Sequence, residues 1–195
     1  MERMKIFTIV TLVVLLSATS VFGGPKTRLL QELVAEDQRL ERLHGLPVII
    51  SEKTYSVLLS PDAIMLGTET VLAFNLVVSN PTRSQLIFSI DKMSAFSANG
   101  RLKILNPDEV VAHHRKFYSR DEYNISKEQE EMLAPFVEEK MERLRQKVMR
   151  SRTLEPGEKV AGILTIEVPF GTPEFTIEVV TGIERHRFEF NVGEF

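Results

Sequence analysis

Apolar and polar residues alternate with a period of two in several short segments of this chain, which is the pattern of a half-buried β-strand. Tyr55, Val57 and Leu59 begin the series, and a β-branched and apolar run follows at 70–79. Further segments of this kind lie at 85–90, 93–97, 101–105, 160–168, 175–180 and 185–192. Asn99-Gly100 and Thr181-Gly182 lie between neighbouring segments and predict hairpins. Repeated short strands without alternating long helices favour a mainly β, antiparallel sandwich.

The period changes to that of a helix within residues 106–153. Ser126 with Gln129 three residues later has the spacing of a capping box, which begins a helix. One apolar face then continues through Met132, Leu133, Phe136, Val137, Met141, Leu144 and Val148. Pro135 lies too far from Ser126 to belong to the first turn, so it predicts a kink or two successive helices. A helical insertion between the middle strands of the sandwich is therefore expected.

Residues 27–44 also show near-helical spacing, with leucines separated by charged residues. Gly45 is a natural stop for a helix, and Pro47 reinforces it. The segment predicts an amphipathic N-terminal helix that either docks on a partner or membrane surface or covers the domain's own core.

The first residues have the order of an export signal. Arg3 and Lys5 precede an apolar stretch at 6–16, and small polar residues follow. We expect cleavage after Gly23, with the segment 18–20 as the second choice and an uncleaved anchor as the alternative. The predicted organisation is a signal peptide at 1–23, a helix and linker at 24–53, and the β domain at 54–195. The protein is expected to be exported, periplasmic or extracellular, with no transmembrane segment in its mature form.

The composition limits how the fold can be stabilised and which partners the chain can bind. The chain contains no cysteine, so neither disulfides nor a lipid-anchoring cysteine is available, and stability must come from packing. Loss of residues 1–23, which hold two basic residues and one acidic residue, would take the net charge from -3 to about -4. Mild acidity argues against nucleic acid or an anionic membrane as a partner of the whole molecule.

His113 and His114 form the most suggestive pair for metal binding, since imidazole is a common ligand of copper and zinc. Adjacent residues point in different directions on a helix or a strand, however, and no further ligands stand at a defined spacing. No nucleophile elbow, zinc-binding helix or phosphate-binding loop occurs. No cofactor and no enzymatic activity are therefore predicted.

A basic cluster follows the acidic front of the insertion. It consists of Arg143, Arg145, Lys147, Arg150 and Arg152. These side chains would suit an anionic polymer or an acidic partner surface. They would equally suit a helix C-terminus, where positive charge complements the helix dipole and neighbouring glutamates neutralise it.

The segment 154–158 reads Leu-Glu-Pro-Gly-Glu and leads into the strand predicted at 160–168, while Asn-Pro-Thr follows an earlier strand at 80–82. Together these motifs resemble the immunoglobulin-like domains of uncharacterised bacterial exported proteins, over residues 54–192. Pro156 and Gly157 suit the two central positions of a type II turn. The resemblance implies an immunoglobulin-like β-sandwich and brings no catalytic residues. The expected function is a non-enzymatic interaction module that binds another envelope protein; the alternative is a metal or small-ligand carrier that uses His113 and His114.

Overall fold

The structure is a computed structural model that describes residues 28–43, 45–62, 70–116 and 126–194. The signal peptide predicted at 1–23 lies outside the described residues. The elements are β1 (Arg28–Leu33), β2 (Gln38–Leu43), β3 (Leu46–Glu52), β4 (Ser56–Pro61), β5 (Val71–Ser79), β6 (Leu86–Phe88), η1 (Ile90–Lys92), β7 (Ser94–Ser97), β8 (Gly100–Ile104), α1 (Pro107–Lys116), α3 (Lys127–Lys147), β9 (Arg152–Leu154), β10 (Lys159–Glu167), β11 (Glu174–Thr181) and β12 (Glu184–Glu194).

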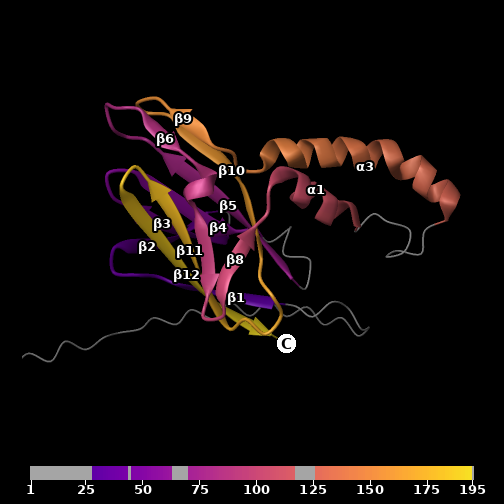
Figure 1. Ribbon diagram of the computed structural model, residues 1–195, viewed down its shortest axis with the longest axis horizontal. Helices are drawn as coiled ribbons and strands as arrows, with labels where there is room; N and C mark the ends of the chain where they lie inside the picture. The colour runs from indigo at the N-terminus through magenta and orange to yellow at the C-terminus, as the bar shows by residue number, and fades with distance from the viewer. Residues whose placement is uncertain (1–27, 44, 63–69, 117–125, 195) are drawn as a thin grey trace, which may run out of the picture.

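One curled antiparallel sheet makes up most of the described chain (Figure 1). Its strand order is β1-β12-β11-β7-β8-β10-β5-β4-β3-β2, and β6 and β9 form a separate pair. The curl brings the two halves of the sheet over a shared core. Inward residues of β11 and β12 there pack with inward residues of β4, β5 and β10. Phe74 lies at the centre, with its ring centroid 5.0 Å from that of Phe190 and 6.1 Å from that of Phe175. The prediction of a mainly β, antiparallel fold is confirmed.

The predicted strands and hairpins agree closely with the structure. β7 and β8 pair across a turn at Ala98-Asn99, one residue before the predicted Asn99-Gly100, and β11 and β12 pair across Gly182-Ile183, one residue after the predicted Thr181-Gly182. Phe175, Ile177 and Val179 face the core from β11, as their alternation predicts. The segment predicted at 85–90 is shorter than expected, because β6 ends at Phe88 and a 3-10 turn follows.

The predicted N-terminal helix at 27–44 is wrong. Residues 28–33 form β1, which pairs antiparallel with β12, and residues 38–43 form β2, which pairs with β3. Both strands add to open edges of the sheet, where unpaired backbone groups of β12 and β3 offer hydrogen bonds along a whole strand. β2 has little buried surface, and the side chains of Leu40 and Leu43 are exposed. Pairing with an existing edge therefore outweighs the near-helical spacing of the leucines.

Asn80 joins the two turns on which the family resemblance rests. Its side chain is buried, and its amide nitrogen donates to the carbonyl oxygens of Ser84, Leu154 and Glu155 at 2.8, 3.0 and 3.2 Å. Its backbone amide donates to the Glu158 carbonyl at 2.9 Å.

Asn80 also holds the turn that precedes β10. The Gly157 amide donates to the Asn80 carbonyl at 2.7 Å, and the Glu158 amide donates to the Glu155 carbonyl at 3.0 Å. Gly157 has a φ of 82°, the positive value that the third position of a type II turn requires. The two motifs, far apart in sequence, thus form one lock at the end of the β5–β10 pair.

Replacing Asn80 with Asp tests this lock. A carboxylate would place an oxygen against three carbonyl oxygens and would remove the donor that they share. The free energy of unfolding in urea should fall by about 3 kcal/mol, the range of a broken buried polar network. The exposed residue Asn99 provides the matched control, and Asn99→Asp should change stability by less than about 0.5 kcal/mol. Equal effects of the two variants would contradict the role of the lock.

Candidate functional site: the helical arm

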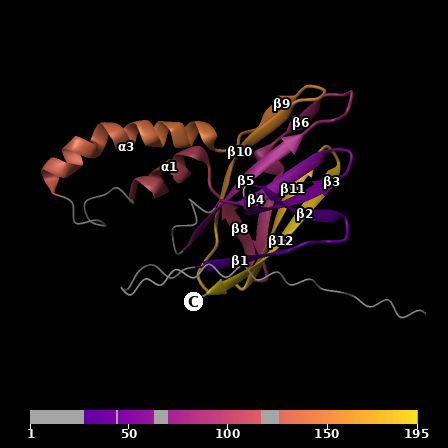
Figure 2. The same ribbon diagram turned by 180° about the vertical axis from the view of Figure 1, so that it is seen from behind.

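Helices α1 and α3 project from one side of the curled sheet and form what we call the helical arm (Figures 1 and 2). They run antiparallel, because Asp108 near the start of α1 pairs with Arg145 near the end of α3 at 3.1 Å. At the other end of α1, Arg115 pairs with Glu138 at 2.8 Å. The part of α3 before Glu138 extends beyond α1, so it forms the outer end of the arm.

The base of the arm is anchored in a small second core. Val110 of α1 and Leu144 of α3 pack there with residues of β5 and β10, among them Ala73 and Ile163. The chain leaving α3 runs along β10, where the Met149 amide donates to the Ile163 carbonyl at 2.9 Å.

Gly162 of β10 allows this close approach. A Cβ atom at this position would lie 2.7 Å from the Cα of Met149 and 2.8 Å from its backbone nitrogen. Such contacts are with backbone atoms, which cannot rotate away. Glycine is therefore required where the arm joins the sheet.

The start of α3 is specified as the sequence predicts. The Ser126 side chain accepts from the Gln129 amide at 3.2 Å, and the Gln129 side chain accepts from the Ser126 amide at 2.8 Å, which is a complete capping box. Of the two alternatives predicted at Pro135, a kink or two successive helices, the second does not hold, because α3 is continuous through Pro135. Its outer part bends out of line with the rest in both views, as expected of a helix that contains an internal proline (Figures 1 and 2).

Half of the apolar face predicted for α3 is exposed. Met141, Leu144 and Val148 are buried at the base, as predicted. Met132, Leu133 and Phe136, which we call the arm patch, are instead 76%, 44% and 75% exposed. Their spacing of three and four residues places them side by side on the helix. The arm thus presents large apolar side chains to solvent, well away from the core.

Acidic residues surround the arm patch. The described side chains of Glu128, Glu131, Glu138 and Glu139 are exposed on the outer half of α3. Glu131, Glu138 and Glu139 are paired with Lys127, Arg115 and Arg143, so a partner groove with basic residues at its rim would exchange these contacts for its own.

Of the five basic residues predicted as a binding site, Arg145 and Arg150 line one depression at the start of α1. Arg143 pairs with Glu139 along the helix, and Arg145 pairs with both Asp108 and Glu142. Arg150 follows the helix and donates to the Arg145 carbonyl. Of the other two, Lys147 ends α3 and Arg152 begins β9, and both are exposed. Partners on α1 and α3 therefore neutralise the first two charges, and the rest are spread over three segments.

His113 and His114 are both half-buried on α1, with ring centroids 6.1 Å apart and ring planes nearly perpendicular. Burial lowers the pKa of His114, and the charges of His113 and Lys140 lower it further. The ammonium of Lys140 disfavours a metal cation beside this ring, and the Asp62 carboxylate favours one. Among the described residues, no group of three or more potential metal ligands is found. The metal site stays a prediction.

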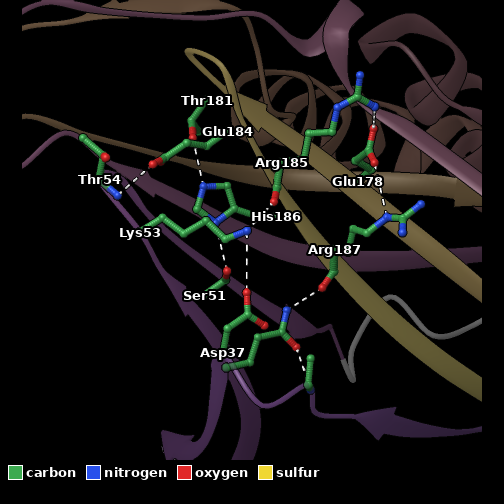
Figure 3. A network of polar contacts seen from close by, with 12 residues as sticks. Asp37, Ser51, Lys53, Thr54, Glu178, Thr181, Glu184, Arg185, His186 and Arg187 are labelled. Atoms are coloured by element: carbon green, nitrogen blue, oxygen red, sulfur yellow. Dashed lines mark hydrogen bonds and ion pairs between the residues drawn. The ribbon is translucent and has the colours of Figure 1, made fainter.

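A buried polar network at the seam between β3 and β12 was not foreseen from the sequence (Figure 3). His186 of β12 is fully buried, with Nδ1 2.9 Å from Ser51 Oγ and Nε2 2.9 Å from Thr181 Oγ1. Burial lowers the pKa of His186, and the charge of Lys53 lowers it further. The neutral ring, one nitrogen donating and the other accepting, satisfies both hydroxyl groups.

Further contacts extend the seam to the loop between β3 and β4. Lys53 donates to the Arg185 carbonyl at 2.8 Å and pairs with Asp37 at 3.6 Å. Burial would raise the pKa of Glu184, but hydrogen bonds from Thr54 and Tyr55 outweigh it, and the pKa is lowered. The network therefore ties the two halves of the curled sheet together.

The contact between Ser51 and His186 has the composition of a nucleophile with its base. Both side chains are wholly buried, as is Thr181. No substrate can reach Ser51 Oγ in this conformation, so the arrangement is structural. The sequence gives little indication of this network, because a single histidine on a strand between two arginines has no distinctive spacing.

The lowered pKa of His186 predicts a dependence of stability on pH. The unfolded histidine, with its ordinary pKa of 6.5, takes up a proton before the folded one does. The stabilisation is therefore present above about pH 6.5 and is lost as the pH falls through the folded value, with a slope of at most about 1.4 kcal/mol per pH unit.

His186→Gln should be less stable than the parent protein at pH 8 and should lose less stability on acidification, as measured by urea unfolding at pH 8 and pH 5.5. The same loss on acidification in both proteins would show that His186 does not contribute this dependence.

The part of the chain that the structure describes contains no helix long and apolar enough to cross a membrane. Comparison of the chain with protein-family models, with curated proteins and with solved structures finds no match.

Proposed function

We propose that this protein is an exported, non-enzymatic interaction module that binds another envelope protein through the arm patch. The observation that carries the proposal is the exposure of Met132, Leu133 and Phe136 on a well-capped helix that extends beyond its neighbour. Scattered apolar residues are common on surfaces, but three adjacent large ones at the end of a projecting helix are typical of an interaction site.

We propose in addition that the β domain is immunoglobulin-like, as the resemblance of its two turn motifs implies. The antiparallel strands and the lock at Asn80 support this proposal. In such an architecture the sheet serves as a scaffold, and the insertion carries the binding surface.

The partner that fits the arm patch has an apolar groove with lysine or arginine at its rim. An amphipathic helix that lays an apolar face into a groove is a recurrent mode of protein recognition, read by residues three and four apart. Glu128 supplies complementary charge, as do Glu131 and Glu139 where cations of the partner replace Lys127 and Arg143. The metal-carrier alternative, with His113 and His114, gains no comparable support.

The double variant Met132→Ser/Phe136→Ser tests the proposal. Full burial of each apolar side chain contributes about 1.5–3 kcal/mol, so affinity for the partner should fall at least tenfold. The partner is identified by crosslinking from a photoreactive residue placed at Glu128 in the native envelope, and the purified pair is then titrated. Binding should weaken as salt is raised, because the border of the patch is charged.

Ile87 and Ile183 are exposed on the β domain and give a matched control. Ile87→Ser/Ile183→Ser removes the same number of exposed apolar side chains and should leave affinity unchanged, and both double variants should retain the parent melting temperature. Full affinity of the arm variant, a partner without a basic-rimmed apolar groove, or crosslinking only to a second copy would contradict the proposal.

A further inference from the structure

The outer face of strands β8, β7, β11 and β12 carries a group of charged side chains that the arm does not use. Register places Glu178 of β11 opposite Arg187 of β12 on one side and opposite Ser94 of β7 on the other. In the same way Phe96 of β7 lies opposite Arg101 of β8. Because side chains alternate along a strand, these residues all project from the face turned away from the core.

Glu178 holds two arginines in place on this face (Figure 3). Its carboxylate, only 8% exposed, contacts Arg185 Nη1 at 2.8 Å and Arg187 Nε at 3.4 Å. The arginine side chains themselves are 69% and 62% exposed. The contacts with Glu178 use one nitrogen of each guanidinium, and each guanidinium has five N–H donors. Donors of both arginines therefore reach solvent from fixed positions.

Two neighbouring contacts order the face further. The guanidinium carbon of Arg187 lies 5.7 Å from the ring centroid of Phe96, within the range of a cation–π contact. Arg101 donates to the Met93 carbonyl at 3.4 Å. Three arginines are thus positioned by a carboxylate, a ring and a carbonyl, which reduces the entropy lost when they bind a ligand.

A shallow depression of about 530 Å³ opens between these side chains. Phe96 and Val180 give it apolar walls, while Lys92, Arg101 and Arg185 give it positive charge. With Arg187 at its edge, four cations face the carboxylates of Asp91 and Glu178. The local charge is positive on a chain whose net charge is -3.

We propose that this face, which we call the arginine face, binds the carboxylates of an acidic peptide segment. The guanidinium edge matches a carboxylate in shape and can donate two parallel hydrogen bonds to it. The apolar walls suit the methylene groups and side chains of a peptide. The net negative charge of the chain disfavours a long polyanion of high charge density, which would meet repulsion beyond the depression. The site does not depend on the arm patch.

Titration of the full chain with hexaglutamate at low ionic strength, followed by calorimetry, tests the proposal. Binding is expected for the parent protein, and Arg185→Gln/Arg187→Gln should weaken it at least tenfold. Arg143→Gln/Lys147→Gln removes the same charge from α3 and should leave binding within twofold of the parent. Arg101→Gln, which does not disturb the Glu178 ion pairs, should weaken binding at least threefold and gives a second readout if the first variant fails to fold.

Three results would overturn the proposal. The first is that the parent protein does not bind hexaglutamate. The second is that the β12 and α3 variants lose affinity equally, which would mean that net charge alone attracts the peptide. The third is that inorganic phosphate at the same anion concentration displaces the peptide completely, which would assign the face to phosphate.

Discussion

The junction at which the end of α3 meets β10 is the constraint that determines the form of this molecule. At Gly162 the two backbones approach so closely that no side chain fits between them, and Met149 is hydrogen bonded to Ile163 beside this point. The junction fixes where the helix leaves the sheet. The second core then fixes its direction, because Leu144 and Val110 close over the same strands. The outer end of α3 can therefore carry exposed apolar residues without folding back onto the sheet.

Many exported domains are stabilised by disulfides; in this chain, buried hydrogen bonds have that role. The chain has no cysteine, so the halves of the curled sheet must be joined by packing and hydrogen bonds. Phenylalanines fill the middle of the core, the buried amide of Asn80 joins two turns at one end, and His186 joins β12 to β3 along the seam. Each polar group is buried with its partners present, which makes its position specific and its loss costly. Such a scaffold can support two independent surfaces, the arm patch and the arginine face.

The sequence predicts the strands well, because residues such as Phe175, Ile177 and Val179 alternate strictly and face one core. It predicts the start of α3 equally well, since a capping box depends on residues only three apart. The predicted helix at 27–44 is wrong because these residues form strands that pair with open edges of the sheet. The pattern of apolar residues within a segment does not show which edges are open. The ion pairing of a predicted basic residue depends on tertiary packing in a similar way. Arg145 is paired by Asp108, and that contact is set by the packing of α1 on α3.

Part of the arginine face could be predicted from the pairing of β11 with β12. The turn predicted at Thr181-Gly182 would place Glu178 opposite Arg185, whereas the observed turn at Gly182-Ile183 places it opposite Arg187, and both arginines lie on the outer side. The neighbouring strands β7 and β8 come from elsewhere in the chain, so Phe96 and Arg101 could not be added without the fold. The seam around His186 likewise joins Ser51 to a residue 135 positions later, a contact that no short spacing encodes.

The central claim is that the arm is a rigid extension of the sheet and not a flexible appendage. The absence of cysteine allows it to be tested directly with spin labels on two introduced cysteines, Glu131→Cys on the outer part of α3 and Glu189→Cys on β12, both at exposed positions. Pulsed electron paramagnetic resonance should give a single narrow distribution of distances between the labels in the free protein. A broad or multiply peaked distribution would show that the arm moves relative to the sheet and would contradict the account.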